Sequence, residues 1–226
     1  MDQVRGILLD IEGTTTPIAF VHEVLFSYAR AHARDFLTKD SDEVRADIAL
    51  LREEHAADTR NNLQPPESIP DYIDWLIDRD RKSTALKSLQ GKIWRQGYLD
   101  GSLKSQVFAD VAPAFERWRR AGLKIGIFSS GSVLAQQLLF AHTDAGDLTG
   151  FIDDYFDTNV GKKGDAESYR KIATAMDLEP SEILFISDVV AELEAAQESG
   201  MKTLLSIRPG NAPQEWPQMT ISFDSV

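Results

Sequence analysis

Three short apolar segments of the chain each end in a polar residue and are followed by a loop and then a helical pattern. The segments and their end residues are 4–9 with Asp10, 124–128 with Ser129, and 183–186 with Ser187 and Asp188. Continuous apolar runs of this length are typical of strands buried on both faces of a parallel sheet. Because ligands of such a sheet bind beyond the carboxyl ends of its strands, these end residues are candidates for one site.

The alternation of strand and helix patterns continues through the second half of the chain. We expect a further strand at 201–207, a weaker one at 151–156, and helices at 111–121, 132–142, 167–176 and 189–199. Strands that alternate with helices indicate an α/β fold with a parallel sheet.

The stretch 19–102 interrupts this alternation because it holds no convincing strand. Its apolar residues follow helical spacing, Ser41 before Asp42 and Glu43 is typical of a helix N-terminus, and 61–66 is rich in loop-forming residues. We therefore predict an α/β catalytic core at 1–18 and 103–226, with a helical cap inserted at 19–102.

Charge and composition exclude several classes of function. The chain has no cysteine, which excludes disulfides, thiolate zinc sites and cysteine nucleophiles and fits a reducing cytoplasm. A formal charge of −12 repels nucleic acids and anionic membrane surfaces. No apolar run approaches the roughly 18 residues of a membrane span. An anionic substrate would then need local positive charge, for example a metal ion and a lysine.

The sharpest motif is Asp10-Ile-Glu12-Gly13, which directly follows the first apolar run. Two carboxylates at this spacing can converge beyond the sheet edge, where one attacks as a nucleophile and the other transfers a proton. Gly13 permits the tight turn that exposes them. Helix capping is the alternative reading for any single acid of this kind.

Two further charged residues could complete such a site. Lys163, after Gly161 and Lys162, could neutralise a phosphate, or it could be a solvated surface lysine. Glu192, four residues after Asp188, could orient that carboxylate or a metal-bound water, or it could be a surface acid of a helix.

Four features of the chain resemble, in the same order, the four motifs of the haloacid dehalogenase-like superfamily. They are the run ending in DIEGTT, the run ending in Ser129, the separate Lys163 and the run ending in Asp188. The resemblance implies a Rossmann-like parallel-sheet core, and the helical insertion resembles the commonest cap of that superfamily.

The motifs are also similar to those of the enolase-phosphatases of methionine salvage. The similarity rests on Glu12, where most phosphatases of the superfamily have Asp, and on GTTTPI, LKSLQGKIW, FSSGS, GKK, ESYRKIA and RPGN. It implies a magnesium-dependent enzyme that enolises 2,3-diketo-5-methylthiopentyl 1-phosphate and then removes the phosphate, which gives the acireductone.

The resemblance also assigns roles to the acidic residues. It implies that Asp10 is the nucleophile, which forms an aspartyl-phosphate, and that Glu12 is the general acid and base. It further implies a Mg²⁺ site formed by Asp10, the backbone carbonyl of Glu12, and Asp188. Two carboxylates with phosphate and water suit the octahedral oxygen shell that Mg²⁺ prefers.

The remaining roles that the resemblance implies concern the substrate. Ser129 and Ser130 would bind the phosphate or neighbouring oxygens, and Lys163 would neutralise the phosphoryl group. Ser187 stands where the superfamily often has Gly or Asp, which leaves the role of Glu192 open. His22 and Glu23 follow the first loop closely and are alternative bases for the enolisation.

Three other functions stay under consideration from the sequence. The nearest is a phosphatase of the same fold that acts on another small phosphate ester without an enolase step. A phosphate-binding module without catalysis is disfavoured, because nucleophile, acid, lysine and metal ligand are all present. A dehalogenase is disfavoured because Glu12 and Asp188 together form the pattern of a metal-dependent phosphatase. We expect a cytoplasmic monomer that acts on a small phosphorylated diketone and binds neither nucleic acid nor membranes.

Overall fold

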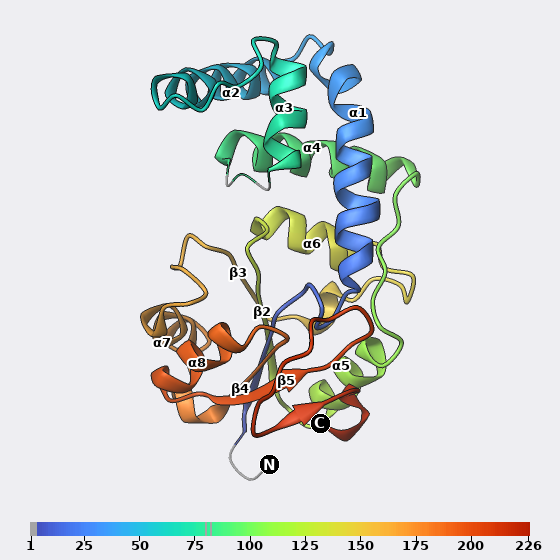
Figure 1. The fold of residues 1–226 in the computed structure, drawn as a ribbon. Coiled ribbons are helices and arrows are strands. Elements are labelled where there is room, and N and C mark those ends of the chain that lie inside the picture. The colour runs from blue at the N-terminus through green and yellow to red at the C-terminus, as the bar shows by residue number, and fades with distance from the viewer. Residues whose placement is uncertain (1–3, 80, 82) are drawn as a thin grey trace. The chain divides into compact units, whose positions relative to one another are not determined.

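The computed structural model of the chain describes residues 4–79, 81 and 83–226, which form two compact units. One unit, here called the sheet unit, consists of Met1–Val21 and Lys104–Val226. The other, the helical unit, consists of His22–Leu103. Each unit is described by itself below (Figure 1).

The strands all belong to the sheet unit. They are β1 (Gly6–Leu9), β2 (Lys124–Phe128), β3 (Asp154–Phe156), β4 (Ile183–Ser187), β5 (Lys202–Ser206) and β6 (Met219–Thr220). The α-helices of this unit are α5 (Val111–Arg120), α6 (Val133–Ala141), α7 (Ala166–Ala175) and α8 (Val190–Ser199), and its 3-10 turns are Thr149–Phe151, Pro180–Glu182 and Phe223–Ser225.

The six strands form one parallel sheet in the order β3-β2-β1-β4-β5-β6. Strands β1, β2 and β3 follow one another toward one edge of the sheet, and β4, β5 and β6 follow one another toward the opposite edge. The strand order therefore reverses between β1 and β4. In the register of the sheet, Leu9 lies opposite Ile127 on one side and Ile186 on the other. The ends of β1, β2 and β4 therefore meet at one edge, at the type of position where open α/β sheets bind ligands.

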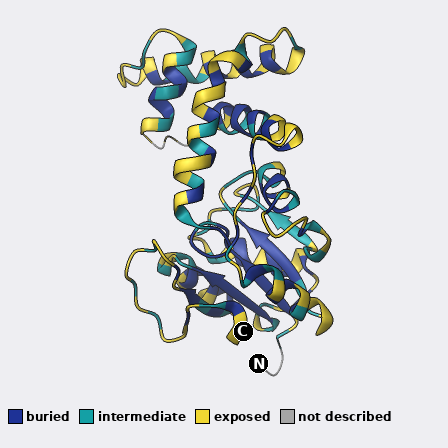
Figure 2. Cartoon of the chain, turned by 90° about the vertical axis from the view of Figure 1, so that its right-hand side faces the viewer, coloured by how far each residue is buried: buried dark blue, intermediate teal, exposed yellow. Residues whose placement is uncertain are grey.

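Helices cover both faces of this sheet. In Figure 1, α7 and α8 lie on one side of the strands and α5 lies on the other. Leu8, Phe185 and Leu205 of the strands pack with Ile172 and Leu193 of α7 and α8 in one buried cluster. Burial on both faces explains the continuous apolar runs, and Figure 2 shows these strands in the colour of buried residues. The predicted α/β fold with a parallel sheet is confirmed.

Most of the predicted elements of this unit agree with the structure to within two residues at each end, with two exceptions. Of the weak strand predicted at 151–156, only Asp154–Phe156 pairs, because Thr149–Phe151 forms a 3-10 turn. The strand β6 was not predicted, since two residues carry no recognisable alternation, and it is held by backbone pairing with β5.

The helical unit contains α1 (Ser27–Leu37), α2 (Asp42–Arg60), α3 (Ile69–Asp78) and α4 (Thr84–Asp100). A π-helical segment, Phe20–Phe26, leads into α1 where the sequence predicts ordinary helical spacing. Among the described residues of this unit there is no strand. The predicted N-terminus at Ser41 is confirmed, since its side chain accepts a hydrogen bond from the Val44 N–H.

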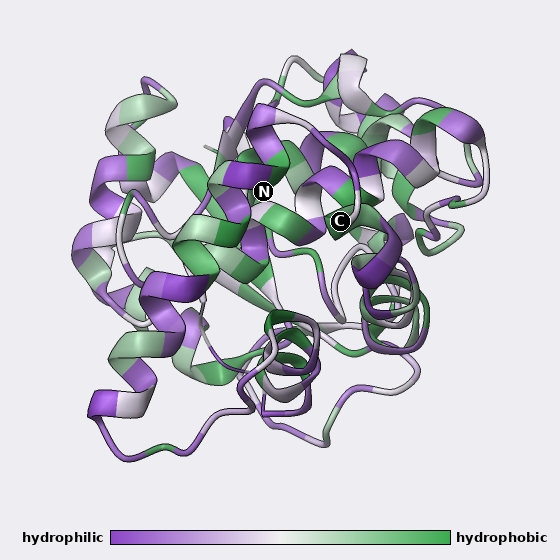
Figure 3. Ribbon diagram, turned by 90° about the horizontal axis from the view of Figure 1, so that it is seen from above, coloured by the Kyte–Doolittle hydropathy of each residue, from purple (hydrophilic) through white to green (hydrophobic). Residues whose placement is uncertain are grey.

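The four helices of this unit are amphipathic and enclose their own core. Leu51, Tyr72, Ile73, Leu76 and Leu89 are buried together, and the helices carry hydrophobic and hydrophilic residues side by side (Figure 3). No helix in the described part of the chain has the length and apolar character needed to span a bilayer.

Candidate active site

Asp10 lies at the end of the central strand β1 and is the most buried carboxylate of the site. It is 5% exposed. Its N–H donates to the carbonyl of Ile186 in β4 at 3.0 Å, which extends the strand pairing by one residue. The backbone is therefore held by the sheet while the side chain leaves its edge. The sheet thus presents a carboxylate in a fixed direction at the reversal of strand order.

The residues after Asp10 form a tight turn. The N–H groups of Thr14, Thr15 and Thr16 all donate to the carbonyl of Ile11, at 2.9–3.2 Å. Gly13 adopts a φ of +70°, and a Cβ added there would overlap the Asp188 carboxylate. Both its conformation and this close approach require glycine at position 13.

Lys163 is brought to Asp10 from a loop 153 residues further along the chain. Its Nζ lies 2.5 Å from Asp10 Oδ1 and 2.7 Å from Glu192 Oε2. The lysine side chain is only 10% exposed. Burial opposes its charge, but the two carboxylates outweigh burial and raise the pKa of Lys163 above its usual value. Lys163 is therefore a fixed ammonium group and not a solvated surface lysine.

The loop that carries Lys163 is tied to helix α7. The hydroxyl of Ser168 donates to the Lys162 carbonyl, and the hydroxyl of Tyr169 donates to the Lys163 carbonyl, both at 2.7 Å. Gly161 has a φ of +146°, and a side chain there would collide with Ser168. The sequence analysis did not identify Ser168 and Tyr169 as anchors of this loop, although both lie in the ESYRKIA motif.

Glu192 joins the site from the first turn of α8. Besides its ion pair with Lys163, its Oε2 accepts a hydrogen bond from the Ser187 hydroxyl at 2.9 Å. Burial, followed by the negative charge of Asp10, raises the pKa of Glu192. Of the two readings of Glu192 from the sequence, the surface acid is wrong, because its side chain is 14% exposed and holds Lys163.

Asp188 lies directly after β4 and packs against Gly13. Its backbone carbonyl accepts a hydrogen bond from the Gln214 amide at 2.9 Å. Burial, and then the charges of Asp10 and Glu192, raise the pKa of Asp188 to about 7. Asp10 and Glu192 both pair with Lys163, and the charges of all three groups act on Asp188, so the four groups together carry more negative charge than the lysine neutralises.

This excess of negative charge makes the site suitable for a divalent cation. Among residues 4–79, 81 and 83–226, no three His, Asp or Glu side chains are close enough to hold a metal by themselves. Two carboxylates, Asp10 and Asp188, with ligand and water oxygens in the remaining positions fit Mg²⁺, which keeps several waters when it binds proteins.

Ser129 and Ser130 follow β2, the strand adjacent to β1. The N–H of Ser129 donates to the Phe156 carbonyl, and its hydroxyl accepts a hydrogen bond from the Gly131 N–H at 3.2 Å. Ser129 is half-buried and Ser130 is exposed. The sheet therefore brings both serines to the edge that carries Asp10.

Glu12 lies in the turn between Ile11 and Gly13 and is half-buried. A backbone bridge pairs it with Thr16, so the backbone around Glu12 is fixed on both sides. Glu12 follows Asp10 by two residues in the chain.

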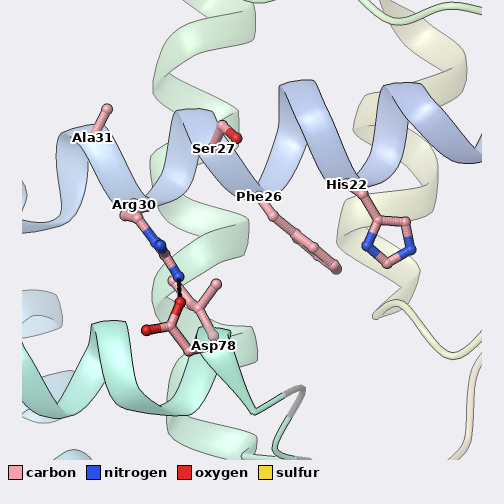
Figure 4. Close-up of a pocket in the computed structure, with 7 residues that line it drawn as sticks. His22, Phe26, Ser27, Arg30, Ala31 and Asp78 are labelled. Atoms are coloured by element: carbon pink, nitrogen blue, oxygen red, sulfur yellow. Dashed lines mark hydrogen bonds and ion pairs between the residues drawn. The ribbon is translucent and has the colours of Figure 1, made fainter.

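The helical unit has a pocket of its own (Figure 4). The cavity has a volume of about 360 Å³ and is lined by His22, Phe26, Ser27, Arg30, Ala31, Ile77 and Asp78. The Arg30 guanidinium pairs with Asp78. The ring of Phe26 contacts His22 edge-on, with 5.3 Å between ring centres. His22, one of the two alternative bases from the sequence, therefore lies in the wall of this pocket.

The raised pKa of Asp188 makes stability depend on pH in the absence of metal. Because its folded pKa of about 7 exceeds the usual value of 3.8, the free energy of unfolding falls as pH rises from about 4 to about 7. We expect Asp188→Asn to raise the free energy of unfolding at pH 8 by about 1–2 kcal/mol, allowing for solvent screening of a half-buried group.

The measurement is urea unfolding of both proteins in EDTA at pH 4.5 and pH 8. The difference between them should shrink toward the lower pH, where Asp188 is neutral in the folded protein. Equal differences at the two pH values would contradict the expectation.

Comparison with known proteins gives a consistent set of relatives. The profile of the haloacid dehalogenase-like hydrolases matches residues 4–200. Enolase-phosphatase E1 of Synechococcus elongatus is 55% identical, over 99% of this chain and 98% of that protein. Enolase-phosphatase E1 of Drosophila mojavensis is 47% identical, over 92% of this chain and 87% of that protein.

Solved structures are similar to the chain as well. The crystal structure of the UTR4 protein of Saccharomyces cerevisiae is similar with a TM-score of 0.81 and 36% identity, and the match covers 99% of this chain and all of that one. CbbY of Rhodobacter sphaeroides, solved with phosphate, is similar in fold, with a TM-score of 0.61 and 19% identity over 97% of this chain and 95% of that one.

Proposed function

The chain belongs to the haloacid dehalogenase-like hydrolases and, within them, to the enolase-phosphatase E1 family, and from this premise we propose how its residues act. The enzyme converts 2,3-diketo-5-methylthiopentyl 1-phosphate to the acireductone and phosphate. The observation that carries the proposal is the buried Asp10–Lys163 pair at the reversal of strand order, beside Asp188 and Glu192.

Phosphate removal begins with the Asp10 carboxylate as nucleophile. Its oxygen forms a bond to phosphorus while the bond between phosphorus and the C1 oxygen breaks, and Glu12 donates a proton to that oxygen. Water then attacks phosphorus, Glu12 takes up a proton from it, and phosphate leaves Asp10. Lys163 holds the phosphoryl oxygens by its fixed positive charge, and the two serines donate hydrogen bonds to them.

Mg²⁺ is the cofactor in this proposal. Asp10, the backbone carbonyl of Glu12, and Asp188 would hold it, and the excess negative charge around Asp188 supports this assignment. When bound, the ion would supply positive charge to the phosphoryl oxygens and to the diketone of the substrate. Glu192 keeps Lys163 beside Asp10, so that the ammonium group is in place before substrate arrives.

Enolisation precedes phosphate removal and requires a base at C1 of the substrate. Glu12 takes the proton from C1, and the oxygen on C2 takes up a proton from solvent and becomes a hydroxyl. Glu12 already serves the oxygen on C1, and its side chain has one methylene more than Asp. We assign to Glu12 both the removal of the proton from C1 and the donation of a proton to the oxygen on C1. His22 or Glu23 is the competing base for the removal.

The helical unit serves as the cap of the enzyme in this proposal, with boundaries near residues 19 and 102. It folds around its own buried core and carries a pocket whose lining includes the rings of Phe26 and His22. Aromatic rings make favourable contacts with sulfur, so this unit would select for the methylthio tail of the substrate.

The proposed function is tested by incubating the enzyme with the diketone phosphate and Mg²⁺ without oxygen. Enol absorbance and free phosphate are followed separately, and enol should appear before phosphate. Phosphate release without any enol signal would reduce the function to a phosphatase of the same fold. Absence of both signals would overturn the proposal.

A further inference from the structure

A segment near the C-terminus, residues 206–211, binds the turn that follows Glu12. The Asn211 amide Nδ2 donates to the Gly13 carbonyl at 2.9 Å and to the Ser206 carbonyl at 3.1 Å. The hydroxyl of Ser206 donates to the same Gly13 carbonyl at 3.4 Å. Two side chains almost 200 residues away thus hold one peptide unit of the turn.

Arg208 fixes the next carbonyl of this turn. Its Nε donates to the Thr14 carbonyl at 3.2 Å, and its guanidinium forms an ion pair with Asp110 at 2.8 Å. The arginine side chain is 4% exposed and lies between the rings of Phe108 and Phe223, at 4.7 and 4.4 Å from their centres. The segment is therefore a rigid support for the turn.

Two side chains of this support each have a buried polar atom without a hydrogen-bond partner among the described residues, namely Nη2 of Arg208 and Oδ1 of Asn211. Of these two atoms, only Oδ1 of Asn211 is an acceptor. A Cβ placed on Gly13 would lie 2.9 Å from this Oδ1 and would overlap the Asp188 carboxylate. The unpartnered oxygen and Asp188 therefore converge on one point beside Gly13. A buried acceptor without a donor costs free energy. This cost favours a donor that is present only when the site holds its metal ion.

We infer that Asn211 is a positioning residue of the metal site, whose Oδ1 accepts a hydrogen bond from a water molecule bound to Mg²⁺ while its Nδ2 holds the Gly13 carbonyl. The inference rests on the proposed function, which places Mg²⁺ at Asp188. Outer hydrogen-bond partners of this kind change metal affinity by 10–100-fold. Neither the spacing of the carboxylates nor their charge identifies this residue.

The test is calorimetric titration of the substrate-free enzyme with MgCl₂. We expect Asn211→Ala to weaken Mg²⁺ binding by about 10-fold or more, because it lacks the acceptor. Asn211→Asp keeps the acceptor and loses the donor to Gly13, so it should bind Mg²⁺ at least as tightly as wild type. Thermal unfolding in EDTA establishes that each variant is folded.

Ser206→Ala is the matched control, because it removes the other donor to the Gly13 carbonyl and leaves Asn211 intact. It should bind Mg²⁺ with nearly wild-type affinity. Should Asn211→Asp fail to fold, the comparison of Asn211→Ala with Ser206→Ala still decides the matter.

Three outcomes would overturn the inference. Asn211→Ala could bind like wild type, Ala and Asp variants could weaken binding equally, or Ser206→Ala could match Asn211→Ala. In the last two cases Asn211 would only support the turn. A wild-type enzyme that binds no Mg²⁺ would instead overturn the metal assignment of the proposed function, so the two failures are distinguishable.

Discussion

Asp10→Asn lowers the rate of phosphate release by at least about 100-fold while the protein stays folded. The amide that replaces the carboxylate cannot form the acyl-phosphate bond at a useful rate, and losses of this order or larger follow removal of an attacking group. The Asn side chain still offers Oδ1 to the Lys163 ammonium, so the loop of Lys163 should stay in place. The measurement is single-turnover phosphate release with the diketone phosphate at saturating Mg²⁺.

Asp154→Asn is the matched control for this variant. Asp154 is a half-buried carboxylate of the same sheet, at the start of β3, and burial raises its pKa as well. Its replacement should leave phosphate release unchanged. Release by Asp10→Asn at more than about a hundredth of the wild-type rate would exclude Asp10 as the nucleophile.

Glu12→Gln is expected to abolish both steps, so that neither enol nor phosphate appears. A glutamine can neither take the proton from C1 nor give one to the leaving oxygen, and loss of a general acid or base typically costs 10²–10⁴ in rate. Enol absorbance and phosphate are measured in the same anaerobic reaction.

The competing base in the helical unit predicts a different pattern for this variant. If His22 or Glu23 removes the proton, Glu12→Gln should accumulate enol while phosphate release is blocked. Enol formation at the wild-type rate would therefore end the assignment of both transfers to Glu12. Glu12→Asp tests reach alone and should keep dephosphorylation while it loses enolisation.

Much of the fold follows from local sequence patterns. The runs before Asp10, Ser129 and Ser187 are apolar because their strands are buried on both faces, and this signal lies within a few residues. The helix start at Ser41 is equally local, since its side chain bonds to the backbone three residues later. Short or irregular elements escape such reasoning, as the two-residue strand β6 and the π-helical Phe20–Phe26 illustrate.

The candidate site, like the fold, could be predicted from the sequence only in part. The identity of its members could be predicted for Asp10, Glu12, Ser129, Lys163 and Asp188, because strand ends and motifs mark them, although their catalytic roles remain proposals. What Lys163 and Glu192 contact could not be predicted, since a surface lysine and a surface helix acid have the same local sequence signals. Their pairing depends on how a loop and the start of α8 meet at one sheet edge.

The sequence by itself therefore determined the sheet, the edge at which polar residues gather and the kind of chemistry that they can perform, because hydrophobic periodicity and short motifs are encoded by neighbouring residues. Only the tertiary structure decided which charges face one another, that burial and neighbouring charges raise the pKa of Asp188 to about 7, and that Asn211 reaches Gly13. Burial and electrostatic interactions depend on distances between residues far apart in the chain, and those distances exist only in the folded protein.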